Sequence, residues 1–195
     1  MFKILLLDNH DSFTYNLAAM FNNYKNIKLT VQTPENTNIK KISEFDKIIF
    51  SPGPGISTDT PFMGAIMEKY YKTHSILGIC LGYQAIAIHF GATISNLKNV
   101  NHGKLKRLKI TDTDSRIFKN ISDNSAIGLY HSWVLDKKNL PDCLKITGEC
   151  EDGNIMAIEH KEYDLTGLQF HPESFITEHG KTIIKNWLDF DSRSV

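Results

Sequence analysis

The sequence predicts an α/β fold, because short buried strands alternate with amphipathic helices along its first half. Three nearly continuous apolar segments, Phe2–Leu7, Lys47–Phe50 and Ser75–Ile79, have the pattern of strands buried on both faces of a largely parallel sheet. Helical patterns cover residues 13–24 and 61–71, which lie between these strands. This alternation of strand and helix is the arrangement found in α/β proteins.

Local signals mark where the two helices begin. Asp11 and Ser12 precede the first helical pattern and are candidate N-caps, because their short polar side chains accept hydrogen bonds from free backbone N–H groups. Pro61 opens the second pattern, and proline is well tolerated in the first turn of a helix. Both helices are therefore expected to start close to these residues.

The second half of the chain has a different character. Short strand candidates at residues 105–110, 144–150, 155–159 and 165–170 are separated by turn-rich stretches, which predicts antiparallel additions to the sheet. Residues 177–190 place apolar side chains on one face of a closing helix. A chain of 195 residues without a linker, repeat or low-complexity tract is expected to form one domain spanning residues 1–195.

Composition argues against two classes of partner. The 22 basic and 22 acidic side chains leave no net charge to hold the chain on nucleic acid or on an anionic membrane. No apolar run approaches the length of a membrane-spanning helix and no signal peptide is recognisable, so a cytoplasmic protein is expected. The three cysteines, Cys80, Cys143 and Cys150, lack the spacing of a zinc site and are expected to be reduced thiols.

Cys80 stands between a predicted buried strand and a predicted helix, in the sequence Gly-Ile-Cys-Leu-Gly. This is the spacing of a nucleophile elbow, in which Gly78 and Gly82 relieve crowding at a sharp turn that exposes the central side chain. The positive end of the helix dipole favours a thiolate at this position. The alternative interpretation is a buried cysteine in a tight turn without a catalytic role.

A nucleophilic cysteine needs a base, and His171 follows the predicted strand at residues 165–170. Glu173 stands two residues later, where its carboxylate could accept a proton from the far nitrogen of the imidazole and fix its tautomer. Seven other histidines are present, and a single histidine is more often a surface or packing residue. The His-Pro-Glu grouping favours a catalytic role.

The segment Ser-Pro-Gly-Pro-Gly at residues 51–55 brings a backbone free of large side chains to the carboxyl end of a predicted strand, where open α/β sheets bind ligands. The N–H groups of Gly53 and Leu81 could form an oxyanion hole. The alternative is an ordinary proline–glycine turn, since no phosphate-binding loop motif is present.

Taken together, these motifs resemble one known family over nearly the whole chain: the glutamine amidotransferase subunits of anthranilate synthase and of aminodeoxychorismate synthase. The resemblance implies a class I glutamine amidotransferase-like (flavodoxin-like) fold, with a mixed, mainly parallel sheet flanked by helices. It rests on landmarks that occur in the family's order, at residues 7–9 and 11–13, 51–55, 78–84, 102–104, 130–133 and 169–174.

The resemblance also implies a role for each site residue. Cys80 would be the nucleophile, His171 the general base and acid, and Glu173 the carboxylate that orients the imidazole. No metal or cofactor is implied in this chain, whereas magnesium is expected in a partner synthase subunit that binds chorismate and receives ammonia released from L-glutamine. The implied glutamine contacts are Gly53, Pro54, Gly55, Gln84, Ser132 and Trp133.

Four positions depart from the commonest family pattern: His10, Tyr83, Asn101 and Trp133. None of them belongs to the predicted triad. Anthranilate synthase is favoured over aminodeoxychorismate synthase because Gly55 and the Tyr-His-Ser-Trp segment look more like the subunits of the tryptophan pathway. The competing hypotheses are a cysteine hydrolase acting on peptides or esters, a subunit shared by both enzymes, or a catalytically silent regulatory subunit.

Overall fold

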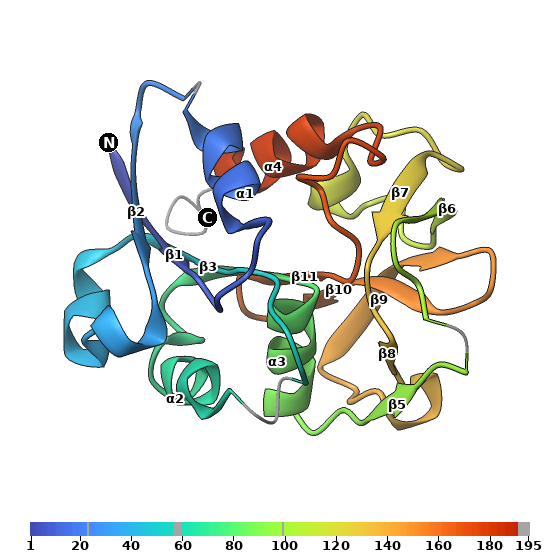
Figure 1. The fold of residues 1–195 in the computed structure, drawn as a ribbon, viewed down its shortest axis with the longest axis horizontal. Coiled ribbons are helices and arrows are strands. Elements are labelled where there is room, and N and C mark those ends of the chain that lie inside the picture. The colour runs from blue at the N-terminus through green and yellow to red at the C-terminus, as the bar shows by residue number, and fades with distance from the viewer. Residues whose placement is uncertain (23, 57–59, 99, 191–195) are drawn as a thin grey trace.

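The structure, a computed structural model, describes residues 1–22, 24–56, 60–98 and 100–190. Its strands are β1 (Phe2–Leu7), β2 (Ile27–Gln32), β3 (Lys47–Phe50), β4 (Ser75–Ile79), β5 (Ile94–Asn96), β6 (Lys104–Ile110), β7 (Ala126–Leu129), β8 (Trp133–Leu135), β9 (Leu144–Cys150), β10 (Ile155–His160) and β11 (Leu165–Leu168). Nine of them form one sheet in the order β2-β1-β3-β4-β11-β10-β9-β6-β7, and β5 pairs separately with β8 (Figure 1).

The sheet is mixed, as the sequence predicts. Strands β2, β1, β3, β4 and β11 run parallel to one another, whereas β10, β9, β6 and β7 are added by antiparallel pairing. The prediction that residues 165–170 form an antiparallel addition is wrong for one of the two edges of that strand. β11 pairs antiparallel with β10 but parallel with β4, and it therefore joins the two halves of the sheet.

The described residues contain four α-helices, which cover the sheet: α1 (Thr14–Phe21), α2 (Pro61–Tyr70), α3 (Leu81–His89) and α4 (Gly180–Asp189). Side chains along β1 alternate between the two faces. Ile4 and Leu6 belong to the core under α1 and α4, whereas Leu5 and Leu7 belong to the core under α2 and α3. Figure 1 shows these two helix pairs on opposite sides of the sheet.

Two local predictions need correction. The N-cap of α1 is Phe13, and neither Asp11 nor Ser12 occupies that position; the Asp11 carboxylate instead accepts a hydrogen bond from the Phe13 N–H at 2.8 Å. Residue 23 of the predicted helix 13–24 lies outside the described residues. Strand β11 ends at Leu168 rather than at residue 170, although the Gln169 N–H still donates to the carbonyl of Met156, which lies opposite it in the register with β10.

The topology brings four chain segments to one edge of the sheet. Because β1, β3, β4 and β11 are parallel, the residues that follow them meet at their shared carboxyl ends. Asn9, Ser51, Cys80 and His171 all lie in these segments. None of the described helices is long and apolar enough to cross a membrane.

Candidate active site

Cys80 forms the turn between β4 and α3 in a strained backbone conformation. Its φ of 51° and ψ of −98° lie where residues with a Cβ atom are rarely found. The flanking glycines are required by close packing. A Cβ atom at Gly78 would lie 2.4 Å from the carbonyl group of Gly82, and a Cβ atom at Gly82 would lie 2.5 Å from Phe50. The strained turn and the closely packed glycines expected of a nucleophile elbow are thus present, whereas the Cys80 side chain is largely buried, with Cys80 7% exposed.

His171 and Glu173 form a buried pair in the loop after β11. The Nδ1 atom of His171 lies 2.7 Å from Oε1 of Glu173, and the two side chains are 3% and 0% exposed. The backbone of His171 is held on both sides, since its N–H donates to the carbonyl of Gly128 and its carbonyl accepts from the hydroxyl of Thr177. The carboxylate therefore favours a proton on Nδ1 and leaves Nε2 as the nitrogen available for acid–base catalysis.

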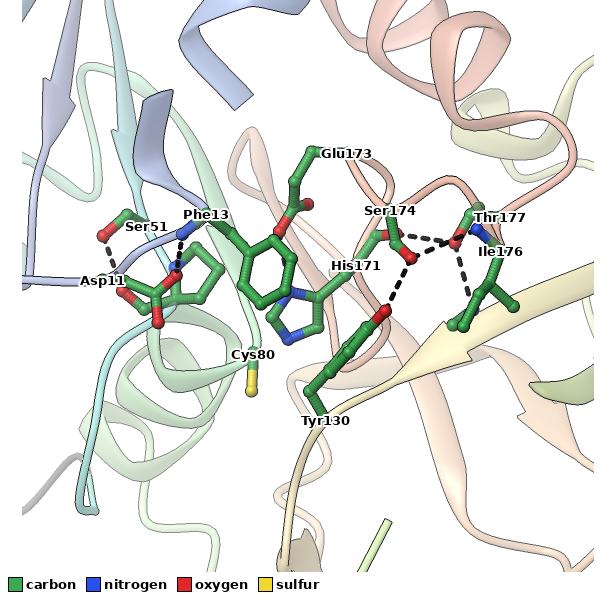
Figure 2. A network of polar contacts seen from close by, with 12 residues as sticks. Asp11, Phe13, Ser51, Cys80, Tyr130, His171, Glu173, Ser174, Ile176 and Thr177 are labelled. Carbon is green, nitrogen blue, oxygen red and sulfur yellow. Dashed lines mark hydrogen bonds and ion pairs between the residues drawn. The ribbon is translucent and has the colours of Figure 1, made fainter. Parts of the chain in front are cut away.

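The Nε2 atom of His171 is buried and has no hydrogen-bond partner of normal geometry among the described residues. Figure 2 shows the imidazole between the Cys80 sulfur and the ring of Tyr130. Burial opposes a charged imidazole, but the interactions with the Cys80 sulfur and with the Glu173 carboxylate outweigh it and raise the pKa of His171 to about 10. The site therefore favours an imidazolium beside the sulfur.

Two aromatic rings enclose the imidazole. The ring centroid of Tyr130 lies 4.9 Å from that of His171, and Phe13, from the start of α1, lies 5.5 Å away, each meeting the imidazole edge to face. The Tyr130 hydroxyl lies 3.0 Å from the hydroxyl of Ser174, which also accepts the N–H of Ile176 (Figure 2). The rings of Tyr130 and Phe13 restrict the movement of the imidazole and exclude water from one side of it. Sequence reasoning did not assign either aromatic residue to the site.

Gly53 lies against the first residue of α3. A Cβ atom there would lie 2.6 Å from Cδ2 of Leu81 and 2.8 Å from Cβ of Asn9, so only glycine fits. Asn9 braces the loop from behind, because its backbone N–H donates to the Ser51 hydroxyl and its side-chain amide donates to the Ser51 carbonyl. Leu81 opens α3, where a helix leaves backbone N–H groups without an intrahelical partner.

A small cavity of about 70 Å³ opens beside Cys80. Pro54 is the one predicted glutamine contact that the described lining does not include; it is exposed within the same loop. A larger hollow of about 510 Å³ beside Arg116 contains none of the predicted catalytic residues, whereas one of about 380 Å³ is lined in part by Glu173 but contains neither Cys80 nor His171. The residues that line the small cavity are Gly53, Gly55, Cys80, Leu81, Gln84, Tyr130, His131, Ser132 and Trp133.

Gln84 spans the wall of this cavity. Its side-chain NH2 group donates to the backbone carbonyl of Trp133 at 3.2 Å and to Oε1 of Gln169 at 3.3 Å. Gln169 in turn donates to the sulfur of Cys80 at 3.6 Å. The resemblance to the family implied a glutamine contact for Gln84 but no role for Gln169, whose contact with Cys80 joins residues that follow two different strands, β11 and β4.

The four departures from the family pattern lie outside the triad. Tyr83 is fully buried in the core and its hydroxyl donates to the Ile155 carbonyl, whereas His10 is exposed and pairs with Glu35. The Asn101 N–H donates to the carbonyl of His131, and Trp133 offers its own carbonyl to Gln84. Two of the four thus bear on the cavity wall, and both do so through backbone groups.

Comparison with known proteins supplies independent information. The family model described as glutamine amidotransferase class-I matches residues 5–190. A Haemophilus influenzae protein assigned as anthranilate synthase component II is 40% identical over 186 residues, covering 95% of each chain. Aminodeoxychorismate synthase component 2 of Klebsiella aerogenes is 38% identical over 187 residues, covering 95% of this chain and 99% of the relative.

A solved structure supports the fold independently of close sequence similarity. It is a Thermoplasma acidophilum protein assigned as a subunit of GMP synthase, and it superposes with a TM-score of 0.85 at 22% identity. The match covers 96% of this chain and 92% of that protein. At this identity the likeness concerns the arrangement of strands and helices, which agrees with the α/β fold that the sequence predicts.

Proposed function

The chain belongs to the class-I glutamine amidotransferase family, and from that premise we propose that it is the glutaminase subunit of a chorismate-using synthase, with anthranilate synthase as the favoured enzyme. One observation carries the proposal. A cysteine held at a strained elbow lines a cavity together with Gly53 and Leu81, and its sulfur interacts with the imidazole of a buried histidine–carboxylate pair. This arrangement suits nucleophilic attack on a carboxamide carbon.

In the proposed first step, the Cys80 thiolate attacks the side-chain amide carbon of L-glutamine. The new C–S bond turns the carbonyl oxygen into an oxyanion, which the N–H groups of Gly53 and Leu81 stabilise by hydrogen bonds. The protonated His171 gives its Nε2 proton to the amide nitrogen, so the C–N bond breaks and neutral ammonia leaves. A γ-glutamyl thioester of Cys80 remains.

In the second step, neutral His171 accepts a proton from water, which attacks the thioester carbon. The C–S bond then breaks, glutamate leaves and the thiolate–imidazolium pair is restored. Glu173 stabilises the positive charge on His171 in both steps without changing its own protonation state. The same imidazole thus serves as acid in one step and as base in the next.

The ammonia must be captured before it becomes ammonium in water, which is why a synthase partner that uses chorismate is part of the proposal. The names of the relatives, component II and component 2, support such a partnership. Relatives named as anthranilate synthase subunits and relatives named as aminodeoxychorismate synthase subunits match at similar identity. The preference for anthranilate synthase therefore rests on Gly55 and the segment 130–133. The competing alternative is a subunit that serves both synthases.

A glutamine-analogue electrophile tests the nucleophile directly. We expect one adduct per chain, on Cys80, and we expect Cys80→Ser to abolish both the adduct and glutamine hydrolysis in the complex. A chain that forms no adduct when bound to its synthase would favour the competing hypothesis of a silent regulatory subunit. Glutaminase activity that survives the substitution would contradict the assignment of Cys80.

Reconstitution tests the choice of pathway. The chain is mixed in turn with component I of anthranilate synthase and of aminodeoxychorismate synthase, each supplied with chorismate, magnesium and L-glutamine. Product is then followed by fluorescence and chromatography. Glutamine-dependent anthranilate is the expected product, and exclusive formation of aminodeoxychorismate would overturn the preference while leaving the glutaminase assignment intact.

A further inference from the structure

Gln169 is a buried polar residue that contacts the candidate nucleophile. Its exposed fraction is 0%, and it stands directly after β11, two residues before His171. Its side-chain nitrogen donates to the Cys80 sulfur at 3.6 Å, and its own backbone N–H is fixed by the carbonyl of Met156 at 2.8 Å. A second polar group thus reaches the sulfur, from the direction of the sheet.

The orientation of the Gln169 amide is determined by a chain of hydrogen bonds. The carbonyl of Trp133 can only accept, so the NH2 group of Gln84 must face it. The second hydrogen of that NH2 group points to Gln169, which must therefore present its carbonyl oxygen to Gln84. The NH2 group of Gln169 is then left facing Cys80. Reversing the Gln84 amide would bring two acceptors together, and reversing the Gln169 amide would bring two NH2 groups together.

We propose that Gln169 is a positioning residue for the nucleophile, and that Gln84 holds its amide so that an N–H group always faces the sulfur. This inference rests on the proposed role of Cys80. A hydrogen bond to a thiolate is charge-assisted and stronger than one to a neutral thiol, so the contact favours the reactive form of Cys80 and fixes its rotamer.

The relay also connects the sulfur to the substrate pocket. Trp133 and Gln84 line the cavity beside Cys80, whereas Gln169 lies behind it. Among the described residues no donor reaches Oε1 of Gln84, which leaves this oxygen free to accept a hydrogen bond from a ligand. A glutamine bound in the cavity would therefore contact the same side chain that orients the donor to the sulfur.

The competing explanation is that the amides of Gln84 and Gln169 only satisfy each other's hydrogen-bonding groups inside the protein and have no effect on Cys80. Methionine separates the two explanations, because it matches the length of glutamine and removes its hydrogen-bonding groups. If the contact is only packing, Gln169→Met leaves the reactivity of Cys80 unchanged at every pH. If Gln169 positions the thiolate, the substitution weakens that reactivity most at low pH.

The experiment measures the rate of Cys80 alkylation by iodoacetamide between pH 5 and 10, in the complete chain, with the modified residue identified by peptide mass spectrometry. We expect Gln169→Met to raise the pH of half-maximal rate by about one unit, because a hydrogen bond to a charged group stabilises it by roughly tenfold in population. Gln84→Met is expected to cause a smaller shift in the same direction, since the Gln169 amide then rotates freely.

The double variant provides the decisive comparison. Because Gln84 acts through Gln169, Gln84→Met with Gln169→Met is expected to match Gln169→Met alone. Additive shifts, or an unchanged profile in Gln169→Met, would overturn the proposal. Thermal unfolding checks that each variant is folded. If Gln169→Met fails that check, the isosteric Gln169→Glu serves instead, since its carboxylate faces the sulfur and is expected to shift the midpoint further upward.

Failure of this inference is distinguishable from failure of the proposed function. An unmodified chain that gives no adduct with a glutamine analogue in the complex contradicts the function itself. If the chain without substitutions reacts normally and Gln169→Met has the same pH profile, only the role of Gln169 is contradicted.

Discussion

His131 is a buried histidine in the wall of the small cavity, and neither of its ring nitrogens has a hydrogen-bond partner among the described residues. Burial disfavours its charged form, and the neighbouring charge of His171 acts in the same direction. Together they lower the pKa of His131 to about 4. The imidazole is therefore neutral at neutral pH, and the cavity wall stays free of a second positive charge beside the catalytic pair.

The lowered pKa of His131 predicts how stability depends on pH. An unfolded histidine titrates near 6.5, so between pH 6.5 and 4 the unfolded chain binds a proton that the folded chain excludes. The stabilisation is complete above pH 6.5 and falls as pH approaches 4, by about 3 kcal/mol. Urea unfolding at several pH values should show this loss in the unmodified chain. His131→Asn should lose less, and parallel curves for the two proteins would contradict the assignment.

The pair His171–Glu173 makes a separate prediction for catalysis. Without the carboxylate, nothing selects the tautomer of His171 or stabilises its positive charge. Glu173→Gln should therefore lower kcat for glutamine hydrolysis in the complex by about 100-fold to 10,000-fold and change KM little. Glu178→Gln, an exposed change in the same loop, is the matched control. Equal kcat values for the two variants would rule out the orienting role.

At the scale of elements, the elbow between β4 and α3 depends on glycine at a point of close approach. Gly82→Ala would place a methyl group 2.5 Å from Phe50 and push α3 away from β3. We expect a loss of about 3 kcal/mol in the free energy of unfolding, together with a displaced Cys80 and lower activity.

Gly64 provides the matched control for that substitution. It lies inside α2, where an added Cβ atom meets nothing within 4 Å. Gly64→Ala should therefore stabilise the protein by about 0.5–1 kcal/mol, because alanine restricts the unfolded chain and favours helix. Chemical unfolding of both variants checks the pair. Similar effects at the two positions would show that close packing at the elbow is not the cause.

Elements with strong local patterns could be predicted from the sequence, and elements defined by their neighbours could not. β1, β3 and β4 are buried on both faces, so their apolar runs give their bounds without further information. β2 also carries a local signal, since apolar and polar residues alternate over Ile27–Gln32 as in a half-buried edge strand, yet it was not predicted. β7 and β8 were also missed, since four and three residues are too few to show a period.

The candidate site divides in the same way. Cys80, His171 and Glu173 stand in local motifs whose spacing predicts their roles. Gln169 carries no such motif, because its partners Gln84 and Cys80 are 85 and 89 residues away in the chain. Residues whose roles depend on contacts between distant segments become visible only when the sheet order is known.

At the scale of the whole molecule, the site is assembled from segments that follow β1, β3, β4 and β11. Parallel strands place all of their carboxyl ends at one edge, so Asn9, Gly53, Cys80 and His171 meet there although they span most of the chain. The antiparallel strands complete the site from the other side, because Tyr130 and the segment that follows it continue from β7. The site therefore lies where the two halves of the sheet meet.

Under the proposed function, ammonia released at this edge has to reach a second active site, so the synthase should cover the region around Cys80. Two large apolar side chains are exposed in segments that contact the catalytic pair: Phe175, 94% exposed, two residues after Glu173, and Tyr15, 71% exposed, two residues after Phe13. Exposed aromatic residues of this kind mark interaction surfaces. We expect both to be buried against the synthase.

Substitution of these residues should weaken the complex without weakening the fold. Burial of an aromatic side chain at an interface typically contributes about 2 kcal/mol, so Phe175→Ser and Tyr15→Ser should each raise the Kd for the synthase by about 30-fold. The free energy of unfolding of the isolated chain should change by less than about 0.5 kcal/mol. Glu44→Ser, exposed just before the amino end of β3 and thus at the opposite edge of the sheet, should leave the Kd unchanged. Titration calorimetry measures each Kd, and a synthase that binds all three variants equally well must dock on a different face.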